Sequence, residues 1–256
     1  MLHSMLDLLS KDSLVMWLNY YGNQCLNVKY KVIHHNGYEV IRKICDGKEV
    51  SEHRLSTSKG QLLFTEYQEN KKACELYEEG RKLWKKRYSE EIPLPDIDII
   101  KERNPYRSDK FFEALKPTGE ASYGTDFKTK LGMTVAQKVI ISVLEQNNLP
   151  FKYQPTITVD GITRYADFVI CVPWLYSCFP LEHFETGRVG NRRKSDSRCS
   201  VTINRYINEG MIPGIDFLIT SNGNKRRFDA ELFEKVLANF INQMSGIIMA
   251  EYNSGK

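Results

Sequence analysis

The sequence predicts an α/β protein, with a hairpin and a long helix in its N-terminal part and a mixed sheet in its C-terminal part. Residues 28–33 and 38–41 alternate in polarity around Asn36-Gly37, a dipeptide favoured in two-residue hairpin turns. Apolar residues then recur every three or four positions from about Lys59 to Ser89, which indicates a long, mostly polar helix. After Gly132 the pattern reads helix, three strands, helix, strand, helix, which is typical of a sheet covered by helices.

Length and composition set the class of protein. The 256 residues are enough for one large domain or two modest ones, and a net charge of +4 permits a nucleic-acid partner without requiring one. No apolar run approaches the ~20 residues of a membrane helix, and the start of the chain lacks a signal-peptide pattern. We therefore expect a cytoplasmic protein without membrane association. The six cysteines form no CxxC pair, so we expect reduced thiols and no zinc site.

The N-terminal part is expected to contain one or two short helices within residues 2–18, then the hairpin, then the long helix. Ile92-Pro93-Leu94-Pro95 ends that helix, because proline cannot continue it, and Gly80 weakens the case for one unbroken helix. Residues 92–130 read as short helices and loops. We place the domain boundary there, giving an N-terminal region of residues 1–120 and a C-terminal domain of residues 121–256.

The C-terminal domain begins with a helix that Thr134 caps and Asn147-Asn148 ends. Three strands are expected next, at residues 151–159, 162–172 and 180–185, and Pro155 breaks the first of them early. A helix at 201–209, a strand at 215–220 and a final helix after Asp229 follow.

Two acidic residues lie in apolar, strand-like runs of this domain. Asp167 stands between Tyr165-Ala166 and Phe168 to Val172, and Glu182 stands between Leu181 and His183-Phe184. Acids are depleted in strands and are rarely buried unless they are paired or bind a metal. If the strands pair, both carboxylates can reach one point, which suits Mg²⁺ or Mn²⁺. The alternative is that Asp167 pairs with Arg164 or a nearby lysine, and that Glu182 faces water on an edge strand.

These acids also carry a resemblance to a known family. Tyr165-Ala166-Asp167-Phe168, followed by Leu181-Glu182-His183-Phe184 and then Met211 to Thr220, resembles the PD-(D/E)XK nuclease superfamily, most of all a bacterial branch with YPDF and WEHFG core motifs. The resemblance covers a little under half of the chain. It implies a restriction-endonuclease-like central mixed sheet flanked by helices. It also implies metal-dependent hydrolysis of phosphodiester bonds, with Asp167 and Glu182 as catalytic residues and metal ligands.

The sequence departs from the family pattern at three positions. Phe184 stands where the superfamily usually has a lysine, and Gln137 and Gln154 stand where it often has glutamates. A glutamine forms hydrogen bonds but brings no charge to a metal. Lys152 or Lys138 could supply the missing ammonium. His183 follows Glu182 as in the bacterial branch, and it is either a general acid or base or a packed or surface side chain.

A basic stretch directly follows the two acids. Between residues 188 and 198 it contains five Lys or Arg residues and one Asp: Arg188, Arg192, Arg193, Lys194 and Arg198 are the basic ones. Such residues neutralise phosphates and give affinity that does not depend on sequence. The alternative is a solvated loop. Lys225-Arg226-Arg227 could extend the basic surface or simply precede the last helix.

Together these observations predict a metal-dependent nuclease that acts on DNA or, less favoured, on RNA. The main alternative is a catalytically decayed nucleic-acid-binding or assembly protein on the same fold, which the missing lysine and carboxylates favour. A third alternative is a protein-interaction module, whose long helix would bind a second copy of the chain or a partner protein.

Overall fold

The computed structural model describes residues 5–93, 95–104, 133–159, 162–184, 192–222 and 228–255, with the backbone alone for 156–165 and 192–198. The protein is of mixed α/β type and divides into two compact units. One consists of Leu14–Ile97, and the other of the residues up to Ser13 together with those from Asp98 onward. The boundary expected near residue 120 lies outside the described residues. Within the described part of the chain, no helix is long and apolar enough to cross a membrane.

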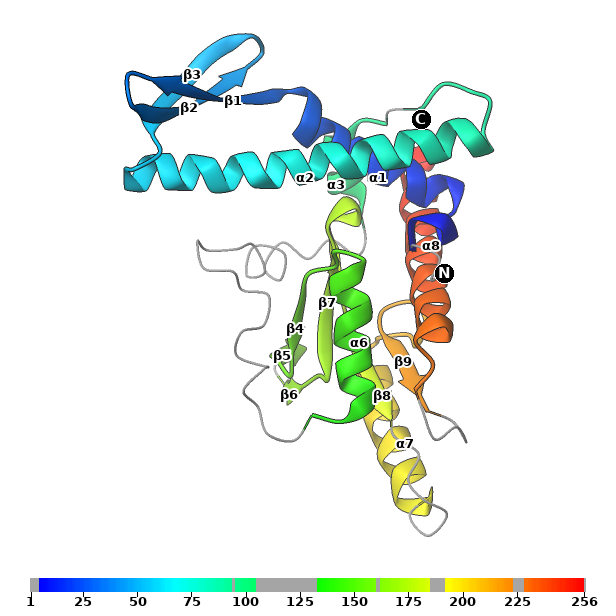
Figure 1. Ribbon diagram of the computed structural model, residues 1–256. Helices are drawn as coiled ribbons and strands as arrows, with labels where there is room; N and C mark the ends of the chain where they lie inside the picture. The colour runs from blue at the N-terminus through cyan, green and yellow to red at the C-terminus, as the bar shows by residue number, and fades with distance from the viewer. Residues whose placement is uncertain are drawn as a thin grey trace. The chain divides into compact units, whose positions relative to one another are not determined.

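The unit Leu14–Ile97 contains a three-stranded antiparallel sheet and a long helix. Its elements are α1 (Lys11–Leu26), β1 (Val28–His35), β2 (Tyr38–Cys45), β3 (Lys48–Arg54) and α2 (Ser58–Arg87). The strands pair in the order β1-β2-β3. The turns Asn36-Gly37 and Asp46-Gly47 both have positive φ at their two central residues, as the hairpin prediction requires. The hairpin is confirmed, and β3 extends it to a meander beside the first half of α2 (Figure 1).

Helix α2 runs without a break for 30 residues, which confirms the long helix. Thr57 caps its start by accepting the Gly60 N–H at 3.0 Å. Gly80 does not interrupt the helix, because it lies where α1 packs closely. A Cβ atom there would come within 3.0 Å of the Leu18 side chain and 3.1 Å of the Trp17 side chain. The glycine therefore serves helix packing.

The second unit is built on a four-stranded mixed sheet in the order β4-β7-β8-β9. Strand β7 pairs antiparallel with both β4 and β8, and β9 pairs parallel with β8. The elements are η1 (Met5–Leu8), α3 (Ile97–Arg103), α6 (Val135–Gln146), β4 (Phe151–Tyr153), β5 (Thr156–Val159), β6 (Ile162–Tyr165), β7 (Phe168–Val172), η2 (Pro173–Leu175), β8 (Ser177–Phe184), α7 (Arg192–Asn208), β9 (Leu218–Ser221) and α8 (Ala230–Ser254).

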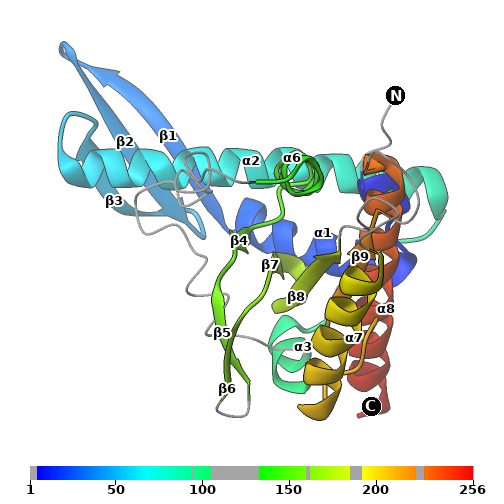
Figure 2. The same ribbon diagram turned by 90° about the horizontal axis from the view of Figure 1, so that it is seen from below.

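Helices cover both faces of this sheet. On one face, Phe179 of β8 packs on Phe240 of α8, and α8 in turn packs on α6 and η1. On the other face, Val169 of β7 packs with Tyr206 of α7 and with Phe217, just before β9. Figure 2 shows α6 on one side of β7 and β8 and α7 on the other. The expected succession of helix, strands, helix, strand and helix after Gly132 is found, with five strands instead of three between α6 and α7.

The early break that Pro155 predicts in the strand at 151–159 is confirmed, since Gln154 adopts a left-handed conformation (φ 47°) and Pro155 has no N–H to donate. Three other expected boundaries were wrong. The strand predicted at 162–172 is broken as well, after Tyr165. Beyond the break, β5 and β6 form a separate two-stranded sheet. Strand β8 begins at Ser177, after a single turn of 3-10 helix, and α7 begins at Arg192 instead of near Val201.

The cysteine prediction was also wrong for four residues. The pairs Cys25–Cys74 and Cys171–Cys178 form disulfides, in which Cys45 and Cys199 take no part. Cys171 and Cys178 face each other directly across β7 and β8. Pairing of this kind depends on strand register and helix packing, which the spacing of cysteines in a sequence does not reveal.

Candidate active site

The candidate site lies where β7 begins and β8 nears its end. Phe168 pairs with Leu181 in the antiparallel register, so one further step brings Asp167 opposite Glu182. The expected placement on adjacent antiparallel strands is found, with Asp167 directly before β7. The Asp167 carboxylate oxygen Oδ2 accepts the backbone N–H of His183 at 2.8 Å. This bond holds the Asp167 side chain against β8, beside the peptide of Glu182.

The carboxylate of Glu182 is buried beneath α7. Only 6% of the residue is exposed, and the hydroxyl of Tyr206 donates to its Oε1 at 2.6 Å. Strand β8 lies between β7 and β9, so the alternative of a water-facing edge position is wrong for Glu182. The alternative pairing of Asp167 with Arg164 stays a prediction, since the Arg164 side chain lies outside the described set.

Strand β4 and the residue after it add two sequence-predicted residues to the same region. The Gln154 N–H donates to the Asp167 carbonyl at 2.9 Å, so Gln154 after β4, Asp167 before β7 and Glu182 in β8 lie in one row. The Gln154 side chain is exposed. Lys152 pairs with Val169 and is half-buried, so its place in the sheet is on the face that α7 covers. The structure thus gathers Lys152 and Gln154 near the two acids.

Gln137 has a structural task at the start of α6. Its side-chain oxygen accepts the Thr134 N–H at 3.0 Å, and the Thr134 hydroxyl accepts the Gln137 N–H at 3.2 Å, which makes a capping box. The same Gln137 oxygen accepts the hydroxyl of Tyr153 at 3.1 Å. Burial raises the pKa of Tyr153, and the negative charge of Asp167 raises it further. Lys138, the other candidate ammonium, is exposed on α6.

His183 lies on the other face of β8 from Glu182. Its ring packs edge-on against Phe228, which precedes α8, with centroids 4.9 Å apart. Its Nδ1 lies 2.9 Å from the hydroxyl of Thr220 in β9. The residue is 7% exposed. The structure therefore does not bring the imidazole together with the Glu182 carboxylate, and strand alternation is the reason.

The predicted basic stretch is helical over most of its length. Arg192, Arg193, Lys194 and Arg198 lie in the first half of α7, and their side chains are outside the described set. Arg188 and Lys225 to Arg227 lie outside the described residues altogether. Because Tyr206 belongs to the same helix, one element carries both the basic residues and the hydrogen-bond partner of Glu182. The alternative of a solvated loop is wrong from Arg192 onward, where the stretch is helical.

Sequence reasoning missed Tyr206. It appears in the chain as an ordinary apolar position of a short helix, and only the fold places its hydroxyl on Glu182. A usable signal was present, because an acid inside an apolar strand needs a donor from a neighbouring element. The described residues contain no group of three or more His, Cys, Asp or Glu side chains arranged to hold a metal.

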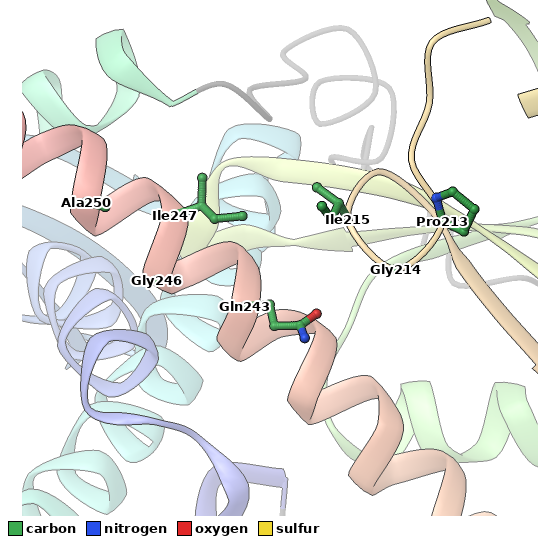
Figure 3. Close-up of a pocket in the computed structure, with 7 residues that line it drawn as sticks. All are labelled: Pro213, Gly214, Ile215, Gln243, Gly246, Ile247 and Ala250. Carbon is green, nitrogen blue, oxygen red and sulfur yellow. The ribbon is translucent and has the colours of Figure 1, made fainter. Parts of the chain in front are cut away.

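A separate hollow of about 580 Å³ lies between α8 and the loop before β9 (Figure 3). Its lining residues carry no ionisable side chain: they are Pro213, Gly214, Ile215, Gln243, Gly246, Ile247 and Ala250. Without an acid, a base or a nucleophile, this hollow offers no group for catalysis.

Comparisons of the chain with protein-family models, with curated proteins and with solved structures find no match. The geometry of Asp167, Glu182 and their neighbours is therefore the basis for assigning a function.

Proposed function

We propose that this protein is a metal-dependent nuclease of the PD-(D/E)XK superfamily, which hydrolyses phosphodiester bonds of DNA. The observation that carries the proposal is the pairing of Asp167 with Glu182 across β7 and β8, with Asp167 tied to the backbone beside Glu182. The order α6, β4, β7, β8, α7, β9, with β9 parallel to β8, supports it as well.

The donor set fits Mg²⁺ or Mn²⁺. Two carboxylates from adjacent strands offer oxygen ligands alone, and Mg²⁺ is usually bound by one or two carboxylates while it keeps several waters. An ion bound there would supply Lewis-acid stabilisation of charge on a phosphoryl oxygen. Asp167 and Glu182 would hold it. Lys152 lies on the sheet face of Glu182 and would contribute positive charge near the phosphate, in place of the lysine replaced by Phe184.

The first half of α7 would supply the nucleic-acid contact. Helix α7 is the next described element after β8, and lysine and arginine side chains bind phosphate groups without reading the base sequence. Such contacts would position the backbone of the substrate without selecting a sequence.

A cleavage assay tests the proposal. Purified protein should cut DNA with Mg²⁺ or Mn²⁺ and not with EDTA, and Asp167→Asn or Glu182→Gln should lose the activity. Asp216→Asn is the matched control, because the Asp216 carboxylate also accepts a backbone N–H, from Ile212 at 2.6 Å, in the loop before β9. Absence of cleavage by the wild type on single-stranded DNA, double-stranded DNA and RNA would refute the nuclease proposal.

A specific observation favours a second candidate, a nucleic-acid-binding protein on the same fold that no longer cleaves. Phe184 replaces the usual lysine, Gln154 brings no charge to the row of acids, and the Gln137 oxygen caps α6 and accepts from Tyr153. Binding to DNA that persists in EDTA, without cleavage under any metal, would select this candidate.

A further inference from the structure

We propose that Tyr206 is a positioning residue, which fixes the Glu182 carboxylate in the orientation needed to hold the divalent cation. This inference rests on the proposed function and extends it to a residue outside the sequence motifs. The hydroxyl of Tyr206 donates to Glu182 Oε1 at 2.6 Å, at the short end for an O–H···O hydrogen bond. A donor to a charged carboxylate makes a stronger bond than one to a neutral acceptor.

The hydroxyl can orient the carboxylate only if the ring is itself fixed, and its surroundings meet this condition. Tyr206 is fully buried, and its ring stacks on Phe217 with centroids 4.4 Å apart and planes at 26°. The same apolar cluster contains Val169 of β7 and Ala166, the residue directly before Asp167. One apolar cluster therefore includes both Tyr206 and the residue beside Asp167, and the tyrosine donates a hydrogen bond to the other acid, Glu182.

The side chain of glutamate explains why such a partner matters. Glu182 has three rotatable bonds, whereas metal ligation requires its carboxylate in one place. A hydrogen bond to Oε1 fixes the plane of the carboxylate and the direction of the other oxygen. Groups that orient metal ligands in this way are commonly as important as the ligands, and removing one typically weakens metal affinity or activity by about 10–100-fold.

The test is the variant Tyr206→Phe, which keeps the ring stack and removes the donor. Calorimetric titration with Mn²⁺ should give a Kd about 10–100-fold higher than that of the wild type. The cleavage kcat should fall with it, while the KM for DNA stays unchanged, because the basic residues of α7 are untouched. A tyrosine that only supports the fold would lower the melting temperature and leave the Mn²⁺ affinity of the folded protein unaltered.

Tyr30→Phe is the matched control. Its hydroxyl also donates to a glutamate, Glu66 Oε2 at 3.1 Å, but in the unit Leu14–Ile97. This variant should bind Mn²⁺ like the wild type. If Tyr206→Phe does not fold, Phe217→Leu replaces it, since it loosens the tyrosine ring and keeps the hydroxyl. It too should weaken Mn²⁺ binding.

The outcomes separate this inference from the proposed function. A wild type that binds Mn²⁺ and a folded variant, Tyr206→Phe or Phe217→Leu, that binds it within twofold of the wild type would overturn the positioning role alone. A wild type that binds no Mn²⁺ would overturn both proposals. Weaker Mn²⁺ binding in the Tyr206 or Phe217 variant, with none in Tyr30→Phe, supports the inference.

Discussion

The substitution Asp167→Asn separates a metal site from a structural role for this acid. It preserves the size and shape of the side chain and removes its charge. The asparagine oxygen can still accept the His183 N–H that Asp167 Oδ2 accepts at 2.8 Å. A hydrogen bond to a charged group contributes roughly 1.5–3 kcal/mol and a neutral one roughly 0.5–1.5, so the expected loss is about 1 kcal/mol.

A second effect opposes that loss in the metal-free protein. The register places Asp167 opposite Glu182, and two nearby carboxylates repel each other. Neutralising one relieves the repulsion. We therefore expect the metal-free variant to melt within about 2–4 °C of the wild type, which corresponds to about 1 kcal/mol for a domain of this size.

The divalent cation should then distinguish the two proteins. At an Mn²⁺ concentration 100 times the Kd, binding to the native state stabilises it by about 2.7 kcal/mol. That is a rise in melting temperature of about 5–11 °C for the wild type. Asp167→Asn should show no such rise, and the control Asp216→Asn should show all of it. Scanning calorimetry with Mn²⁺ and with EDTA measures both quantities.

One result would refute this reasoning. A wild type that gains no stability from Mn²⁺ or Mg²⁺, together with an Asp167→Asn variant that melts far below it in EDTA, would mean that Asp167 is a structural acid. The metal site, and the nuclease proposal with it, would then be wrong.

Three further predictions concern DNA binding, pH and the disulfides. Replacing Arg192, Arg193 and Lys194 by alanine should weaken DNA binding on every sequence. The slope of log affinity against log salt concentration should become shallower by about 2.7, at about 0.9 per phosphate contact. Fluorescence anisotropy at several salt concentrations measures this slope, and removing the three basic residues that end α2 should leave the slope unchanged. The pKa of Tyr153 is raised in the folded protein, so its contribution to stability is complete below pH 10 and is lost as the pH rises through that raised pKa. Asp167→Asn removes one of the two causes, so ultraviolet difference titration against Tyr153→Phe should show the pKa move back toward 10. Replacing both cysteines of a disulfide by serine should lower the free energy of unfolding by about 4 kcal/mol for Cys25–Cys74 and about 2.5 kcal/mol for Cys171–Cys178, because the loops that they close span 49 and 7 residues. Chemical denaturation measures both losses, and equal losses would contradict the loop-entropy account.

The parts of the fold that could be read from the sequence are those fixed by local rules. The turns Asn36-Gly37 and Asp46-Gly47 need positive φ, which these residues tolerate. The caps at Thr134 and Asp229 were recognisable because a short polar side chain must accept an N–H at a helix start. The early break at Pro155 could be read from the sequence, because proline has no N–H to donate. The matching break before Asp167 was missed, because it depends on the hydrogen bonds of Ala166 with Pro155 and of Gln154 with Asp167.

The sequence by itself determined that Asp167 and Glu182 are unusual acids in two successive apolar, strand-like runs, because side-chain chemistry and alternation are local properties. Tertiary structure decided the rest. Strand register placed the two acids opposite each other and Cys171 opposite Cys178. The packing of α7 on the sheet buried Glu182 beneath Tyr206 and turned a basic stretch into the start of a helix. Contacts between residues far apart in the chain depend on how whole elements pack, and no local pattern of residues encodes that.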